Sequence, residues 1–534
     1  MGYSQWVIWS FILAFLHSIN QVTCDRYLVF HPFYSGSHVL TLHSVTEALI
    51  NRGHEVTTLR FADSHDLKLR PLGPKHKEIY LYLDNANGSL PYVTQSEEGQ
   101  FVMPMQLIWD DGLGLSTILK ILHEPWQLIG GYCHQLCQNT QLVRELREAK
   151  FDLVIMDLVY NECGLALISH LKLPYVGYWA FSFVNGEAEL SSVATPPSHI
   201  PMFMTRYTHE MNFLQRSVNL GYKIFGRLFM WGHTRFCDRI AQQYFPEIPP
   251  TMDILADMSG ALLNTDNILD YPRLQPETFL NIGGMQISKS PKPLPQHIQE
   301  WVDGAEHGIV LFTMGFIFNP TIVPKQQLEA LLAAFARLPQ RVIVKFDSPI
   351  ANAPDNVLVL PFVPQQDILA HPKTRVFFTH CGMHGVMEAI YHRVPMVGMP
   401  IFIDQGDVFT RMEEKGIAKG LSKSADQHEI YEAIVEVRDG SRFKENIDRL
   451  SDLMRLRRHH PMEDAIWLLE FVSKTKGAQH LKLSSRHLNL IQYFCLDVLL
   501  LWISLLGLSW KLSAHFWRRY ILGNSKRKNK SKRE

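Results

Sequence analysis

The segment Val376–Gln405 reads VFFTHCGMHGVMEAIYHRVPMVGMPIFIDQ and has the composition of an anion-binding turn. An apolar run, predicted to be a strand, ends at His380, and a glycine turn at Gly382 leads into a predicted helix that contains Glu388. The first backbone N–H groups of a helix have no partner within it, and the helix dipole adds positive charge there. This end of the helix therefore suits a diphosphate.

Polar side chains around this turn could bind the rest of a nucleotide-sugar. His380 could donate to the outer phosphate, and Glu388 could accept from ribose hydroxyls. Asp404 and Gln405 offer acceptors and donors for sugar hydroxyls. A strand, an HxGxxG turn and a helix can also be purely structural, so the longer combination of residues carries the interpretation.

The elements that would position this site form two α/β halves. In the first half, the predicted strands and helices cover Tyr27–His31, Val39–Arg52, Glu55–Leu59, Phe151–Met156, Leu165–His170 and Pro174–Gly177. In the second, they cover Ile309–Phe312, Gln326–Arg337, Arg341–Lys345, Val357–Leu360 and Val376–Thr379. Strands that alternate with helices predict parallel sheets. The proline-rich segment Ser288–Gln296 reads as the linker, and two such halves imply a cleft that holds the ligand.

Both ends of the chain indicate a membrane setting. The apolar run Trp6–Leu16 is typical of a secretory signal, with cleavage expected after Cys24, although a short membrane anchor is an alternative. Ile491–Trp510 is long and apolar enough to span a bilayer, and the basic tail after it is expected in the cytosol. A buried core helix is the alternative. Lys530 and Lys532 match a di-lysine retrieval signal of the endoplasmic reticulum.

Composition limits the remaining possibilities. The 534 residues are 46% hydrophobic and carry no net charge, which indicates several globular domains and no general affinity for nucleic acid. The seven cysteines show no metal-ligand spacing, and we expect Cys133 and Cys137 to pack rather than bridge. Asn87 begins an N-glycosylation sequon that a luminal location would make usable.

The long motif resembles the signature of the UDP-glycosyltransferase family, which includes the animal UDP-glucuronosyltransferases and plant glycosyltransferases. The matching positions are His380, Cys381, Gly382, Gly385, Glu388, Pro395, Pro400, Asp404 and Gln405. Upstream, Phe362 and Gln365 lie where the family stacks an aromatic ring on uracil and binds the ribose. Thr313 and Gly315 resemble the family's turn beside the phosphates, and Arg273 matches an arginine near the diphosphate.

The same resemblance implies a catalytic pair. It places the family's histidine on His38 and its aspartate on Asp157, both after predicted strands. The histidine would deprotonate an acceptor hydroxyl, and the carboxylate would orient it. His31 and His43 lie nearby in the sequence and could also act as a base, but neither aligns with the family's catalytic histidine. The reaction implied is an inverting single displacement, with no cofactor and no metal, in keeping with a chain that contains no Asp-x-Asp pair.

Four residues depart from the family pattern. Phe362 replaces the usual tryptophan, His384 replaces an asparagine, Phe316 replaces a small serine, and Val408 stands where an asparagine is usual. His384 could still donate to a phosphate, with a charge that would depend on pH. These departures leave the donor nucleotide better defined than the donor sugar.

The resemblance implies a GT-B fold: two Rossmann-like domains facing across a cleft, plus one C-terminal transmembrane helix. The expected organisation is a signal peptide 1–24, an acceptor domain 25–287, a linker 288–296, a UDP-sugar domain 297–490, a span 491–510 and a basic tail 511–534. The expected protein is a single-pass type I enzyme of the endoplasmic reticulum membrane, with luminal catalytic domains.

Its implied substrates are UDP-glucuronic acid or UDP-glucose and a small lipophilic acceptor, and no nucleic acid is expected. A homo- or hetero-oligomer is compatible with the sequence. Two alternatives compete with this interpretation: a non-catalytic relative that binds UDP-sugars or lipophiles, and a UDP-sugar epimerase or hydrolase.

Overall fold

The structure, a computed structural model, describes residues 24–31, 36–61, 69–81, 109, 129–182, 190, 193–315, 323–401 and 403–530. The expected signal peptide (apart from Cys24), Asn87 and Phe316 lie outside these residues. The chain divides into two units, Met1–Leu481 and Lys482–Glu534, and the first contains both expected α/β halves.

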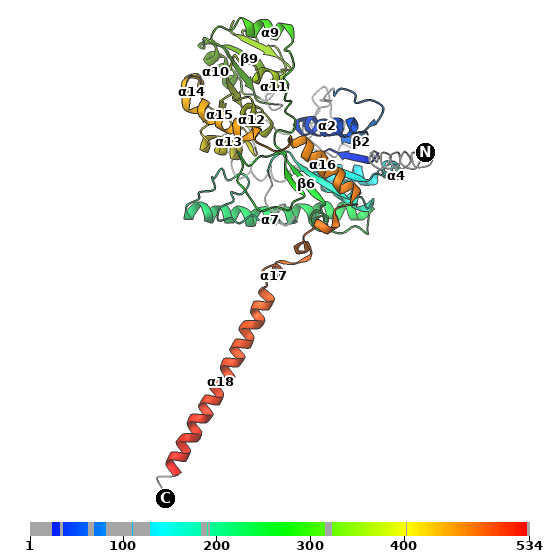
Figure 1. The fold of residues 1–534 in the computed structure, drawn as a ribbon, viewed down its shortest axis with the longest axis vertical. Helices are drawn as coiled ribbons and strands as arrows, with labels where there is room; N and C mark the ends of the chain where they lie inside the picture. Colours follow the sequence, from blue (N-terminus) through cyan, green and yellow to red (C-terminus); the bar gives the residue numbers. More distant parts are fainter. Residues whose placement is uncertain are drawn as a thin grey trace, which may run out of the picture. The chain divides into compact units, whose positions relative to one another are not determined.

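A seven-stranded parallel sheet organises the N-terminal half (Figure 1). Its spatial order is β3 (His76–Leu81), β2 (Glu55–Phe61), β1 (Arg26–Phe30), β4 (Leu153–Asp157), β5 (Tyr175–Trp179), β6 (Gly260–Leu263) and β7 (Phe279–Asn281). From β1 the chain first adds β2 and β3 on one side and then β4 onward on the other. The order therefore reverses between β1 and β4, where open α/β sheets form a crevice at their carboxyl edge.

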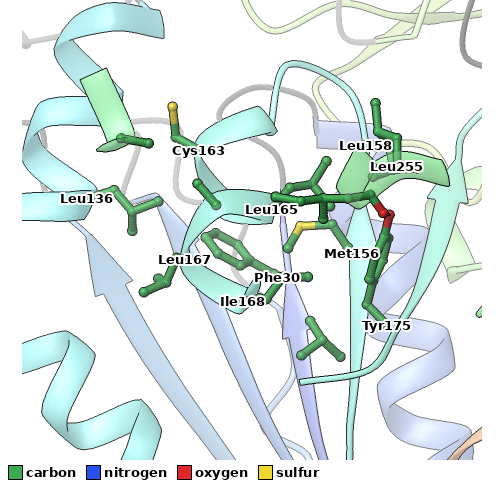
Figure 2. Packing of buried hydrophobic residues seen from close by; sticks show 14 of the residues in the cluster. Phe30, Leu136, Met156, Leu158, Cys163, Leu165, Leu167, Ile168, Tyr175 and Leu255 are labelled. Carbon is green, nitrogen blue, oxygen red and sulfur yellow. The ribbon is translucent and has the colours of Figure 1, made fainter. Parts of the chain in front are cut away.

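Strict alternation along β1 divides its side chains between two helix layers. Leu28 and Phe30 join one apolar cluster, and Tyr27 and Val29 join the other. The first cluster, part of which Figure 2 shows, includes residues of α4 (Thr140–Glu148), α5 (Glu162–His170), α7 (Phe213–Tyr244) and α8 (Thr251–Ala256). The second includes residues of α2 (Gly36–Asn51) and α16 (Pro461–Lys474). Both faces of the sheet are covered, which explains why its strands are apolar throughout.

The C-terminal half contains a six-stranded parallel sheet. Its order is β10 (Val357–Leu360), β9 (Arg341–Lys345), β8 (Ile309–Thr313), β11 (Thr374–Thr379), β12 (Met396–Gly398) and β13 (Ala418–Gly420). Apolar clusters cover both faces of this sheet. One cluster includes residues of α10 (Lys325–Ala336) and α14 (Gln427–Asp439). The other includes residues of α9 (Gln296–Asp303), α11 (Gln365–Leu369), α12 (Met383–Tyr391), α13 (Gln405–Glu414) and α15 (Ser441–Arg455). Here the order reverses between β8 and β11.

The end of the first unit departs from the expected domain boundary. Helix α16 contacts α2, β4, β6 and β7, and its residues Ala465, Leu468 and Leu469 are buried in the N-terminal core. The expected continuous domain 297–490 is therefore wrong for this helix, which returns to the first sheet. The apolar face of α16 completes the layer that α2 begins, a long-range pairing that local sequence does not reveal.

The second unit contains α17 (Leu490–Tyr493) and the long helix α18 (Leu496–Lys530). Its segment Leu496–Ile521 has a mean hydropathy of 1.5 and no buried side chains in its apolar window, so it can cross a membrane by length and composition. The segment begins five residues after the expected start at Ile491. The backbone at Cys495 has a left-handed φ of 52°, which ends α17 before α18 begins.

One cysteine expectation is wrong. Cys133 does not merely pack, because it forms a disulfide with Cys163 at the start of α5, with a Cα–Cα distance of 5.3 Å. Cys137 is a free buried thiol, as expected. The bridge joins residues 30 positions apart, and the spacing of Cys133 and Cys137 on one helix gave no sign of it.

Candidate active site

His38 and Asp157 meet at the reversal point of the first sheet. His38 lies in the first turn of α2, which follows β1, and Asp157 is the last residue of β4. The Nδ1 atom of His38 is 2.7 Å from Oδ2 of Asp157, and both side chains are buried. The other carboxylate oxygen accepts from the backbone N–H of Val159 at 3.1 Å, which fixes the aspartate. This arrangement leaves Nε2 of His38 as the ring nitrogen that can accept a proton.

The two rival histidines lie in different surroundings. Burial lowers the pKa of His31 to about 3, and its Nδ1 has no hydrogen-bond partner among the described residues. Burial also lowers the pKa of His43, whose ring contacts His76 edge-on. Neither forms an ion pair with a carboxylate within the described part of the chain. The pairing with Asp157 thus distinguishes His38 from its neighbours.

The glycine turn lies at the reversal point of the second sheet. Gly315 follows β8, and His380 and Gly382 follow β11. A Cβ at Gly382 would lie 2.5 Å from Nε2 of His380, and a Cβ at Gly315 would lie 2.9 Å from the same ring. Gly315 also has a φ of +64°, and its N–H donates to Oγ1 of Thr313 at 3.2 Å. Both glycines are thus needed for the imidazole to fit between the strand ends.

The start of α12 has the features of an anion site. Gly382 is the N-cap residue and offers no side chain to the first-turn N–H groups. No acidic residue occupies the first turn. Burial lowers the pKa of His380 to about 4, so its ring is neutral at physiological pH and its Nδ1 is a buried atom without a partner among the described residues. The positive potential here therefore comes from the helix end rather than from His380.

The residues expected at uracil and ribose lie together on α11 and α12. Nε2 of Gln365 donates to one oxygen of Glu388 at 2.8 Å, and Gln286 donates to the other at 3.5 Å. Burial raises the pKa of Glu388, and the hydrogen bonds from the two amides partly offset this rise. Phe362 precedes α11 with 77% of its surface exposed, so its ring is open to stacking.

His384, in the first turn of α12, contacts the N-terminal half. Its Nε2 is hydrogen-bonded to Oγ1 of Thr41 on α2, and Nδ2 of Asn264 lies 3.4 Å from its Nδ1. Burial lowers its pKa to about 3. The expectation that its charge would depend on pH is therefore wrong, because it stays neutral throughout the physiological range. A Cβ at Gly385, next along the helix, would lie 3.2 Å from Nε2 of Gln365 and 3.3 Å from the ring of Phe377.

Asp404 lines a small cavity with two arginines. The lining residues are Phe181, Ser182, Pro201, Phe203, Arg273, Met383, Asp404, Asp407, Val408 and Arg411. Burial raises the pKa of Asp404 to about 6. Gln405 points elsewhere, since its Oε1 accepts from the N–H of Ile401 at 2.8 Å. The structure thus places Asp404 at a cavity and uses the Gln405 oxygen to fix the turn.

The arginines of this cavity are bound to a buried carboxylate. Arg273 and Arg411 approach Asp270 at 3.4 and 3.2 Å. Burial would raise the pKa of Asp270, but the two guanidinium groups hold it at about 2. Arg273 also donates to Ser182 at 3.1 Å.

Several residues of this site were missed from the sequence. Thr41 could have been noticed, because it lies one helical turn after His38 on the same face. Gln286, Asn264, Asp270 and Arg411 lie outside the motif, and no local pattern marks them.

Comparison with known proteins agrees with this geometry. The sequence model of the family described as "UDP-glucoronosyl and UDP-glucosyl transferase" matches residues 28–527. The chain belongs to this family. It is 31% identical over 508 residues to human UDP-glucuronosyltransferase 1A10, covering 93% of each chain. It is 31% identical over 481 residues to mouse UDP-glucuronosyltransferase 1A7, covering 87% of this chain and 86% of that one. This glycosyltransferase thus matches relatives along nearly their whole length.

Solved structures share its fold. The glycosyltransferase VinC, solved with DTDP, superposes with a TM-score of 0.55 at 16% identity, covering 84% of this chain and all (100%) of that one. The glycosyltransferase of kitacinnamycin gives 0.54 at 18% identity, with 84% and 98% covered. The expected GT-B architecture of this family member, with two Rossmann-type parallel sheets, is confirmed.

Proposed function

We propose that this glycosyltransferase moves glucuronic acid or glucose from a UDP-sugar to a hydroxyl of a small lipophilic acceptor, with inversion at the anomeric carbon. The pairing of His38 with Asp157 at 2.7 Å carries the proposal. With Nδ1–H donated to the carboxylate, Nε2 accepts the acceptor's proton while its oxygen attacks the sugar. Asp157 stabilises the imidazolium that forms.

UDP leaves toward the start of α12 in this proposal. Charge develops on the outer phosphate as the bond to the sugar breaks, and the unpaired first-turn N–H groups after Gly382 face that charge. His380 would add one neutral N–H donor. Phe362 would stack on uracil, and Gln365 with Glu388 would bind the ribose hydroxyls. This set of donors needs neither a metal nor a cofactor.

Charge balance at the Asp404 cavity favours glucose over glucuronate. Arg273 and Arg411 are both paired with Asp270, while Asp404 and Asp407 line the same cavity. Both guanidinium groups that line the cavity are thus bound to Asp270, and a sugar carboxylate would add negative charge beside Asp404 and Asp407. A neutral hexose meets no such penalty. A competition assay with equal UDP-glucose and UDP-glucuronate would contradict this preference if glucuronide were the main product.

The proposed setting follows from the two ends of the chain. The apolar helix Leu496–Ile521 would anchor the enzyme as a single-pass type I protein of the endoplasmic reticulum membrane, with its catalytic domains in the lumen. Acceptors that partition into lipid would be concentrated near such an enzyme. Protease protection of intact microsomes tests this orientation, since a cytosolic catalytic unit would be digested without detergent.

UDP release separates the proposal from its alternatives. The full chain is assayed with each donor and a panel of phenols, beside His38→Ala. Acceptor-dependent UDP release that the substitution abolishes supports the transferase. Absence of UDP release from both proteins would instead indicate a non-catalytic relative, equal release by both would show that His38 is not the base, and release without acceptor would indicate an epimerase or hydrolase.

A further inference from the structure

Asn161 closes the turn between β4 and α5, four residues after Asp157. It is the N-cap residue of α5, and its side chain is fully buried. An asparagine at this position usually accepts from the first N–H groups of its helix, but this side chain makes no such bond. Helix capping therefore does not explain why a polar side chain is buried here.

The amide of Asn161 joins the ends of the two strands beside the catalytic pair. The pairing of β1 with β4 ends at Phe30 and Met156, so His31 and Asp157 are the next residues outward. Nδ2 of Asn161 donates to the carbonyl of Asp157 at 3.0 Å and to that of His31 at 3.3 Å. One side chain thus continues the connection between these strands past their last backbone pair, at the reversal point of the sheet.

Tyr132 fixes the direction in which this amide faces. Its phenolic hydroxyl donates to Oδ1 of Asn161 at 2.7 Å, and its side chain is also fully buried. Because the amide oxygen accepts this bond, the amide nitrogen is the atom that faces the two carbonyls. A Cβ at Gly164 would collide with the same oxygen, so a glycine at this position of α5 leaves room for the amide.

A disulfide connects the same two segments beside this hydrogen bond. Cys133, which follows Tyr132, is bridged to Cys163, which lies two residues after Asn161. Tyr132 and both cysteines belong to the apolar cluster that covers one face of the first sheet. Asn161 is thus anchored to the buried core of the N-terminal half.

The turn that Asn161 holds determines where the Asp157 carboxylate lies. Within this turn the N–H of Val159 donates to Oδ1 of Asp157 at 3.1 Å, while Oδ2 faces Nδ1 of His38 at 2.7 Å. Tyr160 has a left-handed φ of 51°, which is unfavourable for a residue with a side chain. The turn therefore needs bonds that hold its shape, and the bond from Asn161 to the carbonyl of Asp157 spans it from end to end.

We propose that Asn161 is a positioning residue for the His38–Asp157 pair, with Tyr132 as its support. Asn161 acts through the carboxylate of Asp157 rather than on a substrate. Without its two donated bonds the turn can shift, and a displaced carboxylate no longer holds the imidazole ready to accept a proton. The inference rests on the proposed function, because it requires that His38 is the base.

The acidity of the acceptor hydroxyl separates a role in base catalysis from a general structural role. A weakly acidic alcohol needs the base to remove its proton, whereas an acidic phenol gives up its proton readily. The full chain is therefore assayed with benzyl alcohol and with 4-nitrophenol, using UDP-glucose and UDP-glucuronate in turn. Asn161→Ala and Tyr132→Phe are compared with Asp157→Asn, and thermal unfolding confirms that each variant is folded.

Asn356→Ala is the matched control. Nδ2 of Asn356 also donates to backbone carbonyls, which belong to Phe335, Leu338 and Gln340. Asn356 directly precedes β10, so it lies at the amino end of a strand, whereas the site forms at the carboxyl edges of the sheets. Its loss removes the same kind of amide without touching the turn of Asp157.

We expect Asn161→Ala to lower kcat about 10-fold or more with benzyl alcohol and clearly less with 4-nitrophenol, without a change in KM for the donor. Tyr132→Phe should show the same selectivity with a smaller loss, and Asn356→Ala should show none. Equal losses with both acceptors, or no loss in either variant, would overturn the proposal even if Asp157→Asn shows the selective loss. If Asp157→Asn shows no selectivity, the proposed base is itself wrong and this inference falls with it.

Discussion

Thr41 on α2 is hydrogen-bonded through its hydroxyl to Nε2 of His384 on α12, so the helix starts that leave the two sheets touch each other. Thr41 lies three residues after His38. Its hydroxyl also donates to the carbonyl of Ser37 at 3.1 Å. The proposed base and the proposed phosphate site are therefore joined through one side-chain pair.

Loss of the base should remove turnover while leaving donor binding. We expect His38→Gln to lower kcat by roughly 10²- to 10⁴-fold, the usual contribution of a positioned general base. Asp157→Asn should lower kcat strongly as well, because the amide holds the wrong ring tautomer. Steady-state kinetics with a phenol acceptor measures both. His43→Gln, on the same helix, is the matched control, and an equal loss there would refute a specific role for His38.

Breaking the contact between the halves should affect catalysis from either side. Thr41→Val keeps the shape of the side chain but removes the hydroxyl, and we expect it to lower kcat about 10-fold by misplacing the base relative to the donor. His384→Ala should have a similar effect, and the double variant should add little. A double-variant cycle on kcat checks this. If His384→Ala instead raises KM for the UDP-sugar while Thr41→Val is silent, His384 acts on the phosphate.

Acid should destabilise the folded unit through its buried neutral histidines. His384 has a folded pKa of about 3 and His380 of about 4, both lowered by burial. The unfolded chain takes up protons below about pH 6.5 while the folded sites do not, so stability falls as pH drops from there toward the folded pKa. Each site contributes a loss of about 1.4 kcal/mol per pH unit.

Replacing one of these histidines should flatten that dependence. We expect His384→Asn to reduce the acid loss by about 1.4 kcal/mol per pH unit, measured by urea unfolding between pH 6.5 and pH 4.5. His428→Gln, at an exposed position, is the control variant. Parallel pH curves for wild type and His384→Asn would contradict the buried neutral state.

Local pattern was enough to predict the elements around the site. Strands Arg341–Lys345 and Val357–Leu360 match β9 and β10 residue for residue, because continuous apolar runs between helices are typical of doubly covered parallel strands. His38 and Asp157 come together because both follow strands that flank one reversal point. The family resemblance pointed to these two residues, and the sheet order explains how they come to lie next to each other.

Contacts between distant segments were beyond local pattern. The return of α16 to the first sheet and the Cys133–Cys163 bridge each depend on three-dimensional packing. The low pKa of His384 depends on how the two halves bury it. Sequence describes a side chain's chemistry, whereas its charge state also depends on desolvation by residues hundreds of positions away.

Changes at Phe362 should alter donor binding without affecting the fold. The ring is 77% exposed, so Phe362→Ala costs little stability. If it stacks on uracil, its loss removes about 1–3 kcal/mol, and KM for the UDP-sugar should rise roughly 5- to 150-fold. Phe362→Trp restores the family's larger ring and should lower KM. Leu456→Ala, also exposed, controls for surface truncation. Unchanged donor KM in both Phe362 variants would show that the ring does not contact the base, and uracil would then have to be bound by backbone groups elsewhere on the second sheet.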